Sequence, residues 1–267
     1  MFEKINSSDM YFKRSLILSI ILTASFPQGN GLPSCHANCQ FSQNFNEPLI
    51  IPDKCNKTMM SSFNLCQVRF ELDYTQRTIF VNFGTELMSR QKRTISDVPY
   101  DYIIETLRIN GTRIETTVFY SCTLGERCEE EYLLSTIPKL IEKNYQDLQK
   151  GLIDLLDHSR STSPLTCELV SSSGSGTCNG TCYNYRSQLI NSTSYQPIFT
   201  TDSPSCSDKI VSASIQIMSS KTPFSDTQYI HGRTFDYYCA NSLCNNAETN
   251  LRVQELMDKY YTSIYQK

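Results

Sequence analysis

The sequence predicts an α+β protein made of two small disulfide-stapled modules, each an antiparallel sheet followed by a C-terminal amphipathic helix. Three observations favour this fold class. The chain of 267 residues contains 12 cysteines, each half has a strand-like approach to a closely spaced cysteine pair, and an apolar helical pattern follows each pair. We expect a first module over residues 30–158, a linker over 159–166 and a second module over 167–267.

Residues 1–29 have the pattern of a secretory signal peptide. Lys13 and Arg14 precede the apolar run Ser15–Phe26, which is too short for a membrane-spanning helix of about 20 residues. Cleavage is expected between residues 25 and 31, and a retained anchor is the alternative. The mature protein is therefore expected to be secreted and extracellular, with no membrane span after cleavage.

All the cysteines follow this segment, and an even number of them in an oxidising compartment indicates a disulfide framework. We expect every one to be disulfide-bonded: Cys35, Cys39, Cys55, Cys66, Cys122, Cys128, Cys167, Cys178, Cys182, Cys206, Cys239 and Cys244. The alternative is a metal or reactive site at Cys35, His36 and Cys39, because Cys-x-x-x-Cys pairs could supply thiolates. Disulfides are favoured, so no metal ligand and no cofactor are predicted.

The best-defined element of the first half is a hairpin over Tyr102–Cys122. Asn110-Gly111 suits a type I′ turn, because both residue types tolerate positive φ. Pairing about that turn places Leu107 opposite Ile114. A second hairpin is expected between strands 68–72 and 79–83, which both alternate apolar and polar residues.

Helical periodicity follows the last cysteine pair of each half. It predicts a long helix over residues 135–157 in the first module and a helix over 247–264 in the second. Because the order of elements is the same in both halves, we interpret them as copies of one six-cysteine module. Chance similarity is the alternative, since the cysteine spacings of the two halves differ.

Cys239 and Cys244 are separated by four residues and followed by Asn245. This clip resembles the last disulfide of the Ly6/uPAR and snake-toxin three-finger family, over about ten residues. The first half departs from the family pattern, because Glu129 stands where the asparagine is expected. The resemblance implies a binding module without catalysis, with the bridges Cys167–Cys182, Cys178–Cys206 and Cys239–Cys244.

Two kinds of modification are expected on the surface. The N-x-S/T pattern marks glycan acceptors at Asn56, Asn110, Asn179 and Asn191. In addition, Arg90, Lys92 and Arg93 form an R-x-K-R pattern that resembles a proprotein-convertase site. A solvated loop is the alternative interpretation of this basic stretch.

The net charge of −3 argues against a nucleic-acid partner, and no catalytic motif is present, so we predict no enzyme and no catalytic residue. The predicted function is a secreted, disulfide-rich, glycosylated binding module for an extracellular protein or cell-surface receptor. Its candidate binding loop is the hairpin tip with Arg108, Asn110 and Arg113. The alternatives are a secreted inhibitor of an extracellular enzyme and a structural matrix component; the oligomeric state is left open.

Overall fold

The structure is a computed structural model that describes residues 34–57, 59–60, 65–84, 101–123, 126–156, 164–170, 174–190, 197–207, 214–225 and 228–264. The chain divides into two compact units, Met1–Leu32 and Pro33–Lys267, and all described residues belong to the second. The predicted signal peptide and the predicted processing residues Arg90, Lys92 and Arg93 lie outside the described residues. Among the described helices, none is long and apolar enough to cross a membrane.

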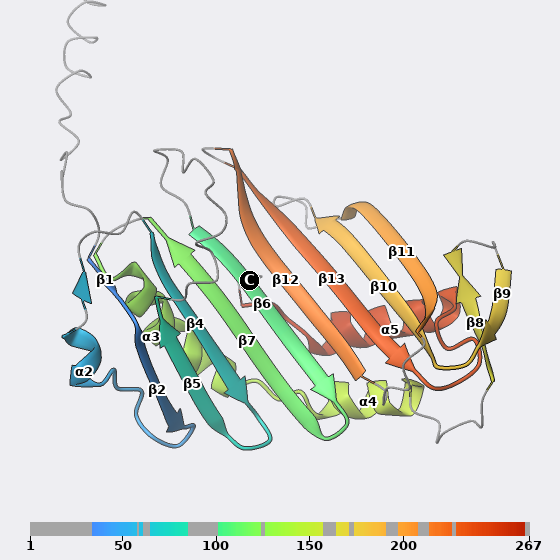
Figure 1. Ribbon diagram of the computed structural model, residues 1–267, viewed down its shortest axis with the longest axis horizontal. Helices are drawn as coiled ribbons and strands as arrows, with labels where there is room; N and C mark the ends of the chain where they lie inside the picture. Colours follow the sequence, from blue (N-terminus) through green and yellow to red (C-terminus); the bar gives the residue numbers. More distant parts are fainter. Residues whose placement is uncertain are drawn as a thin grey trace, which may run out of the picture. The chain divides into compact units, whose positions relative to one another are not determined.

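The main feature is a nine-stranded antiparallel sheet (Figure 1). In spatial order its strands are β11 (Pro197–Ser207), β10 (Thr181–Ile190), β13 (Gln228–Cys239), β12 (Ser214–Ser225), β6 (Asp101–Asn110), β7 (Arg113–Cys122), β4 (Cys66–Asp73), β5 (Thr78–Phe83) and β2 (Cys39–Asn44). Two short two-stranded sheets accompany it. They pair β1 (Cys35–His36) with β3 (Met59–Met60), and β8 (Leu165–Leu169) with β9 (Gly174–Cys178).

The prediction of two small modules, each with its own sheet, is wrong. β6 from the first half pairs with β12 from the second half, from Asn110 opposite Ser214 to Ile103 opposite Lys221. The two halves therefore share one continuous sheet. The physical reason is that both strands are apolar on one face and would each leave an unpaired backbone edge, which their mutual pairing removes.

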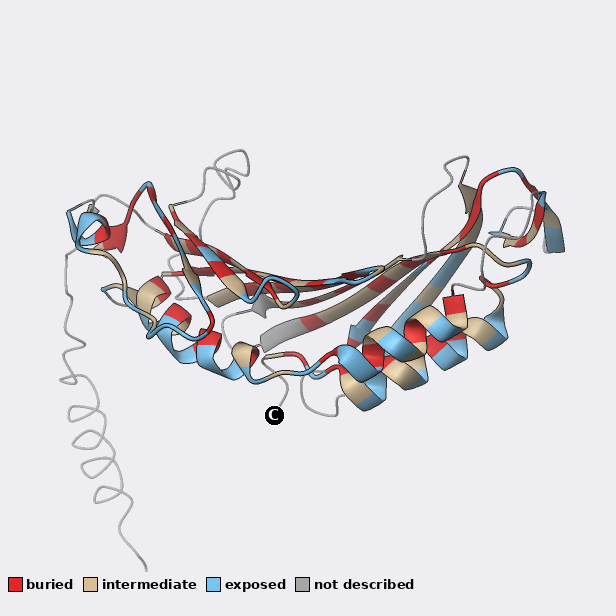
Figure 2. Cartoon of the chain, turned by 90° about the horizontal axis from the view of Figure 1, so that it is seen from below, coloured by how far each residue is buried: buried red, intermediate tan, exposed pale blue. Residues whose placement is uncertain are grey.

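The helices lie on one side of this sheet (Figure 2). They are α3 (Cys128–Ile141), α4 (Gln146–Leu156) and α5 (Ala247–Tyr260), while α2 (Asp53–Asn56) is a single turn. The helix predicted over 135–157 is thus two helices, and the helix predicted over 247–264 ends at Tyr260. Where the chain turns between α3 and α4, Asn144 Oδ1 accepts the Gln146 N–H at 2.9 Å. This Asx turn satisfies one of the backbone N–H groups that the first turn of α4 leaves unpaired.

The position of α4 also contradicts separate modules. Its buried residues join the same core cluster as Val253 and Met257 of α5, beneath the second half of the sheet; they are Leu148, Leu152 and Leu156. The two helices approach closely at Gly151, where a Cβ atom would lie 2.8 Å from the Leu256 side chain. A helix from the first half therefore belongs to the core cluster of the second half, together with Leu107, Ile109 and Ile114 of β6 and β7. A second core cluster, between α3 and strands β2, β4 and β5, consists of first-half residues.

The two predicted hairpins form, one with a different register. The hairpin of β4 and β5 pairs the two strands that were expected, with Val68 opposite Phe83. In the hairpin of β6 and β7, Asn110 pairs with Arg113, so Leu107 lies opposite Thr116 and not opposite Ile114. Gly111, at φ 56°, is the first central turn residue. Because the shift is two residues, each side chain keeps its predicted face.

All twelve cysteines are disulfide-bonded, as predicted. The pairs are Cys35–Cys66, Cys39–Cys55, Cys122–Cys128, Cys167–Cys182, Cys178–Cys206 and Cys239–Cys244. The last three are those implied by the resemblance to three-finger proteins, whereas kinship with that family stays a prediction. Six disulfides fit an extracellular protein, because such bonds persist in oxidising compartments.

Candidate functional site

The face of the sheet opposite the helices carries a group of aromatic side chains on β10 and β13. Tyr183 lies opposite Tyr238, with ring centroids 4.8 Å apart. Tyr185 is two residues further along β10 and 36% exposed. Side chains alternate between faces along a strand, so these residues alternate with buried Asn184 and Tyr237 of the helix side. We call Tyr183, Tyr185 and Tyr238 the tyrosine cluster.

A row of polar side chains crosses the sheet beside the tyrosine cluster. Arg108, Gln216, Asp236 and Tyr185 are register partners on β6, β12, β13 and β10. The Arg108 Nε–H donates to Gln216 Oε1 at 2.9 Å, and the Tyr183 hydroxyl donates to Asp236 Oδ2 at 3.4 Å. We call this set the polar row. It places a cation, an amide and a carboxylate next to exposed aromatic surface.

Burial changes the acid–base properties at the junction of the row and the cluster. It raises the pKa of the Asp236 carboxyl above its usual value, and the hydrogen bond from Tyr183 and the charge of Arg108 oppose this. Burial, together with the charge of Asp236, raises the pKa of Tyr183 to about 12. At neutral pH the Tyr183 hydroxyl therefore keeps its proton and can donate it in a hydrogen bond.

The structure divides the three residues of the predicted binding loop. Arg108 belongs to the polar row, and Asn110 is exposed at the end of β6. Arg113 lies across the turn, 3.3 Å from Asp73 and 2.5 Å from Glu115 through Nη2. Its charge is already balanced by these carboxylates. Arg108 is thus the better placed of the two arginines for contact with a partner.

The residues considered for a metal or reactive site form a buried cluster at the other end of the sheet. Cys35 and Cys39 are in disulfides, so they offer no thiolate. The His36 ring, 1% exposed as a residue, has Nδ1 3.1 Å from the Cys55 carbonyl oxygen and Nε2 2.7 Å from Glu130 Oε2. Both ring nitrogens are therefore engaged within the protein.

The last disulfide of each half is closed by cysteines a few residues apart, Cys122–Cys128 and Cys239–Cys244. The residue after each of these clips, Glu129 or Asn245, has the same structural role in both halves. Asn245 Oδ1 accepts the N–H of Glu168, which follows Cys167, at 2.9 Å. Glu129 Oε1 accepts the N–H of His36, which follows Cys35, at 2.7 Å. In the first half, Cys35 is bonded to Cys66, which lies opposite Cys122 in the sheet. In the second half, Cys167 is bonded to Cys182, which lies opposite Cys239.

The two equivalent side chains differ at their second atom. Asn245 Nδ2 donates to the carbonyl oxygens of Glu168, Tyr183 and Ser205 at 3.0–3.3 Å. Glu129 has an oxygen instead, Oε2, which is buried and has no hydrogen-bond partner among the described residues. Burial raises the pKa of the Glu129 carboxyl; the nearby Glu130 charge adds to this effect, and the hydrogen bond from His36 opposes it.

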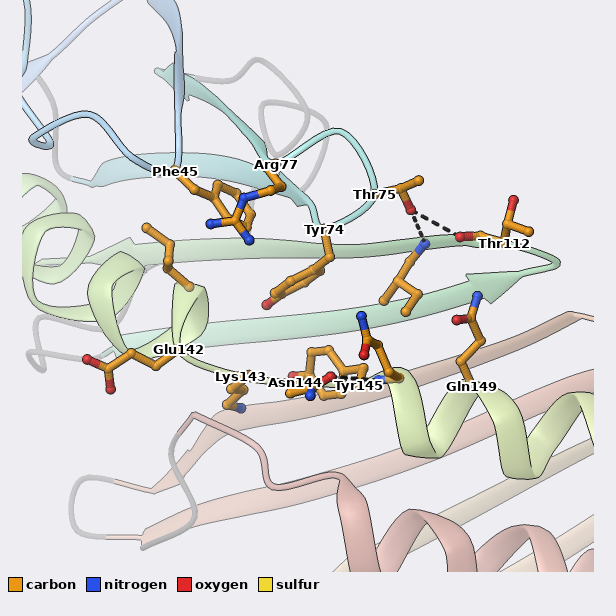
Figure 3. A pocket seen from close by; sticks show the side chains of 13 residues that line it. Phe45, Tyr74, Thr75, Arg77, Thr112, Glu142, Lys143, Asn144, Tyr145 and Gln149 are labelled. Carbon is orange, nitrogen blue, oxygen red and sulfur yellow. Dashed lines mark hydrogen bonds between the residues drawn. The ribbon is translucent and has the colours of Figure 1, made fainter.

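A pocket of about 490 Å³ opens where α3 meets α4. Figure 3 shows Phe45, Tyr74 and Arg77 along one wall, and Lys143, Tyr145 and Gln149 along the other. These residues come from the loop after β2, the turn between β4 and β5, the 142–145 connection and α4. No local sequence pattern predicts the pocket, because it forms only where these segments meet.

The predicted glycan acceptors differ in placement. Asn56 and Asn179 are exposed, as is Asn110 at its hairpin. Asn191 lies outside the described residues. The exposed positions leave room for glycans, and their modification stays a prediction.

Sequence reasoning missed the tyrosine cluster and Asp236. A signal was present in the alternation of Tyr183 and Tyr185 with Asn184, which is typical of a strand with one aromatic face. They share a row with Arg108 only because β6 pairs with β12.

No family model matches the chain, and comparison with curated proteins and with solved structures likewise finds no match.

Proposed function

We propose that the protein is a secreted, non-catalytic binding module that holds an extracellular protein or cell-surface receptor on the tyrosine cluster and polar row. The observation that carries the proposal is the register of Arg108, Gln216, Asp236 and Tyr185 across four neighbouring strands. This register joins exposed aromatic area to oriented hydrogen-bonding groups on the face opposite the helices.

The composition of this surface supports a protein partner. Tyrosine and arginine are enriched at interfaces, because their side chains bring large contact area and polar tips. A tyrosine side chain has few rotatable bonds and loses little entropy on binding. Here the strands of a disulfide-bonded sheet hold the side chains, so less ordering is required when the partner binds.

The buried cluster around His36 supports the non-catalytic part of the proposal. A general base has to reach a substrate proton. The His36 side chain is 0% exposed and lies against Glu130. Glu129 is 0% exposed as well. These groups hold β1 to the start of α3, and they do not face the pocket or the tyrosine cluster.

The test begins with a multimerised form of the secreted protein, screened against purified ectodomains of surface receptors and secreted proteins. Each partner found is titrated with Tyr185→Ala and Arg108→Ala variants. We expect affinity losses of about tenfold or more, typical of central contacts. The matched control is Phe80→Ala on β5, because Phe80 is 37% exposed and Tyr185 36%.

The proposal holds if the Phe80 variant keeps its affinity within about twofold while the Tyr185 variant loses it. The proposal is overturned if every partner binds the Tyr185→Ala and Arg108→Ala variants with the affinity of the parent protein. Secretion is checked separately, by sequencing the N-terminus of protein recovered from the medium. A start between residues 25 and 31 would agree with the predicted cleavage.

A further inference from the structure

We propose that the pocket between Arg77 and α4 binds an acidic sugar, meaning a saccharide ring that carries a carboxylate or a sulfate group. This is a second site, separate from the partner surface of the proposed function. Its volume of about 490 Å³ lies within the range of small-molecule sites, about 300–1,000 Å³.

Arg77 provides the anion-binding group. Of the arginines in the described ranges, Arg69, Arg113, Arg127, Arg186, Arg233 and Arg252 have carboxylate partners. Arg108 donates to Gln216. Arg77 has neither an ion pair nor a side-chain hydrogen bond among the described residues; its guanidinium lies over the Phe45 ring, 5.4 Å from the centroid. All its N–H groups are therefore available to a ligand.

The local backbone holds Arg77 in this position. Asp73 Oδ1 accepts the N–H groups of Thr75 and Gln76, each at 2.9 Å, and fixes the turn. Arg77 has φ 56°, in the left-handed region that favours glycine. Its carbonyl oxygen accepts the Phe45 N–H at 2.9 Å. The left-handed conformation therefore belongs to the turn between β4 and β5, and it fixes where the Arg77 side chain leaves the backbone.

Lys143, the other cation of the lining, does not compete for this role. Its ammonium donates to the Thr262 carbonyl oxygen and lies 3.6 Å from Glu105. Burial lowers the pKa of Lys143, and the Glu105 carboxylate opposes that change. In Figure 3 the Glu142 side chain points away from Arg77. Among the described lining residues, Arg77 is thus the cation without a carboxylate partner.

The remaining lining favours a polyhydroxylated ring over an apolar ligand. Most of the lining side chains are polar, whereas drug-like pockets are mostly apolar. Gln149 Nε2 is anchored on the Gly111 carbonyl oxygen at 2.6 Å, which leaves its Oε1 as an acceptor for a hydroxyl group. Tyr74 is half-buried and supplies apolar surface against which a sugar ring can pack. Phe45, edge to face with Tyr74 at 5.7 Å, is only 8% exposed and supports the Arg77 guanidinium from below.

The experiment screens the protein on an array of sialylated, uronic-acid-containing, sulfated and neutral glycans, and then titrates the best acidic glycan by calorimetry. Its neutral counterpart serves as the reference ligand. The variant is Arg77→Gly, because glycine adopts the left-handed φ without strain and keeps the turn folded. The matched control is Arg252→Ala, an exposed arginine of α5 outside the pocket.

We expect the acidic glycan to bind at least about tenfold more tightly than the neutral one, and Arg77→Gly to remove this preference. The Arg252 and Tyr185→Ala variants should bind the glycan as the parent protein does. Titration with the free acidic monosaccharide and with a glycoprotein that carries the same sugar distinguishes a site for small molecules from a site for protein-linked glycans. Equal binding of neutral glycans, an unaffected Arg77→Gly variant, or no binding at millimolar concentration would overturn the proposal. None of these outcomes bears on the proposal that the tyrosine cluster and polar row bind a protein partner.

Discussion

At the scale of single residues, Glu129 is unexpected, because it is a fully buried carboxyl group. It occupies the position that Asn245 fills in the second half, where an amide donates to backbone carbonyls. A carboxylate cannot donate, but a protonated carboxyl can. Burial raises the pKa of Glu129, and among the described residues no group donates a hydrogen bond to its Oε2. Both observations disfavour the charged carboxylate at this position.

We therefore predict that Glu129→Gln stabilises the protein at neutral and alkaline pH. The carboxyl has a higher pKa in the folded than in the unfolded chain. Its contribution to stability is thus complete below about pH 4.3 and is lost as the pH rises through the folded value. Glutamine keeps the Oε1 acceptor for the His36 N–H and is uncharged at every pH. Urea unfolding at pH 7.5 should show a gain of about 1–3 kcal/mol.

The control for this substitution is Glu131→Gln, on the same turn of α3 but exposed. It should change the free energy of unfolding by less than about 0.5 kcal/mol. The groups that face Glu129 are His36, Glu130 and, through Glu130, Arg127. If Glu129→Gln lowers stability at pH 7.5, or keeps the pH slope of the parent protein, the carboxyl is charged in the folded state.

At the scale of elements, the seam between β6 and β12 contains a buried carboxylate. Glu105 is 0% exposed, and its Oε2 accepts the Ser263 hydroxyl at 2.8 Å and the Ile264 N–H at 2.9 Å. Its Oε1 lies 3.6 Å from the Lys143 ammonium. Glu105 thus ties the centre of the sheet to the α3–α4 connection and to the segment after α5.

Glu105→Leu should destabilise the protein by about 1–3 kcal/mol, because it leaves the partly buried Lys143 ammonium without its carboxylate and removes the acceptor of Ser263 and Ile264. The double variant with Lys143→Met should recover part of that loss, since no unpaired charge then remains. A double-mutant cycle of urea unfolding measures the coupling. Glu115→Gln, which affects a more exposed ion pair with Arg113, should cost less than about 1 kcal/mol. Additive single effects would exclude a coupled pair.

At the scale of the whole second unit, the shared sheet and the placement of α4 imply one cooperative unit. The strands of both halves are joined through β6 and β12, and α4 packs in the core cluster beneath the second half. Loss of either half would expose the apolar face of the other. We therefore predict a single unfolding transition whose calorimetric and van't Hoff enthalpies agree.

Hydrogen exchange tests the same coupling locally. Ile217 on β12 is 0% exposed at the seam, and Ile217→Asp should weaken amide protection in β4 and β7 of the first half as well as in β10 and β13. Protection lost only in the second half, or two separate calorimetric transitions, would show that the halves unfold independently.

The sequence by itself predicted that every cysteine is disulfide-bonded, where the two hairpins lie and which side chains of their strands face inward, but not the full disulfide connectivity or the register of the β6–β7 hairpin. These follow from local rules, because side-chain alternation, helical periodicity and turn residues act over a few positions. The tertiary structure decided the rest. Pairing of β6 with β12 and packing of α4 on α5 depend on which distant edges and apolar faces meet. The same long-range pairing placed Arg108 in one row with Tyr185 and Arg77 opposite α4. The sequence therefore named Arg108 alone and could not show which residues accompany it.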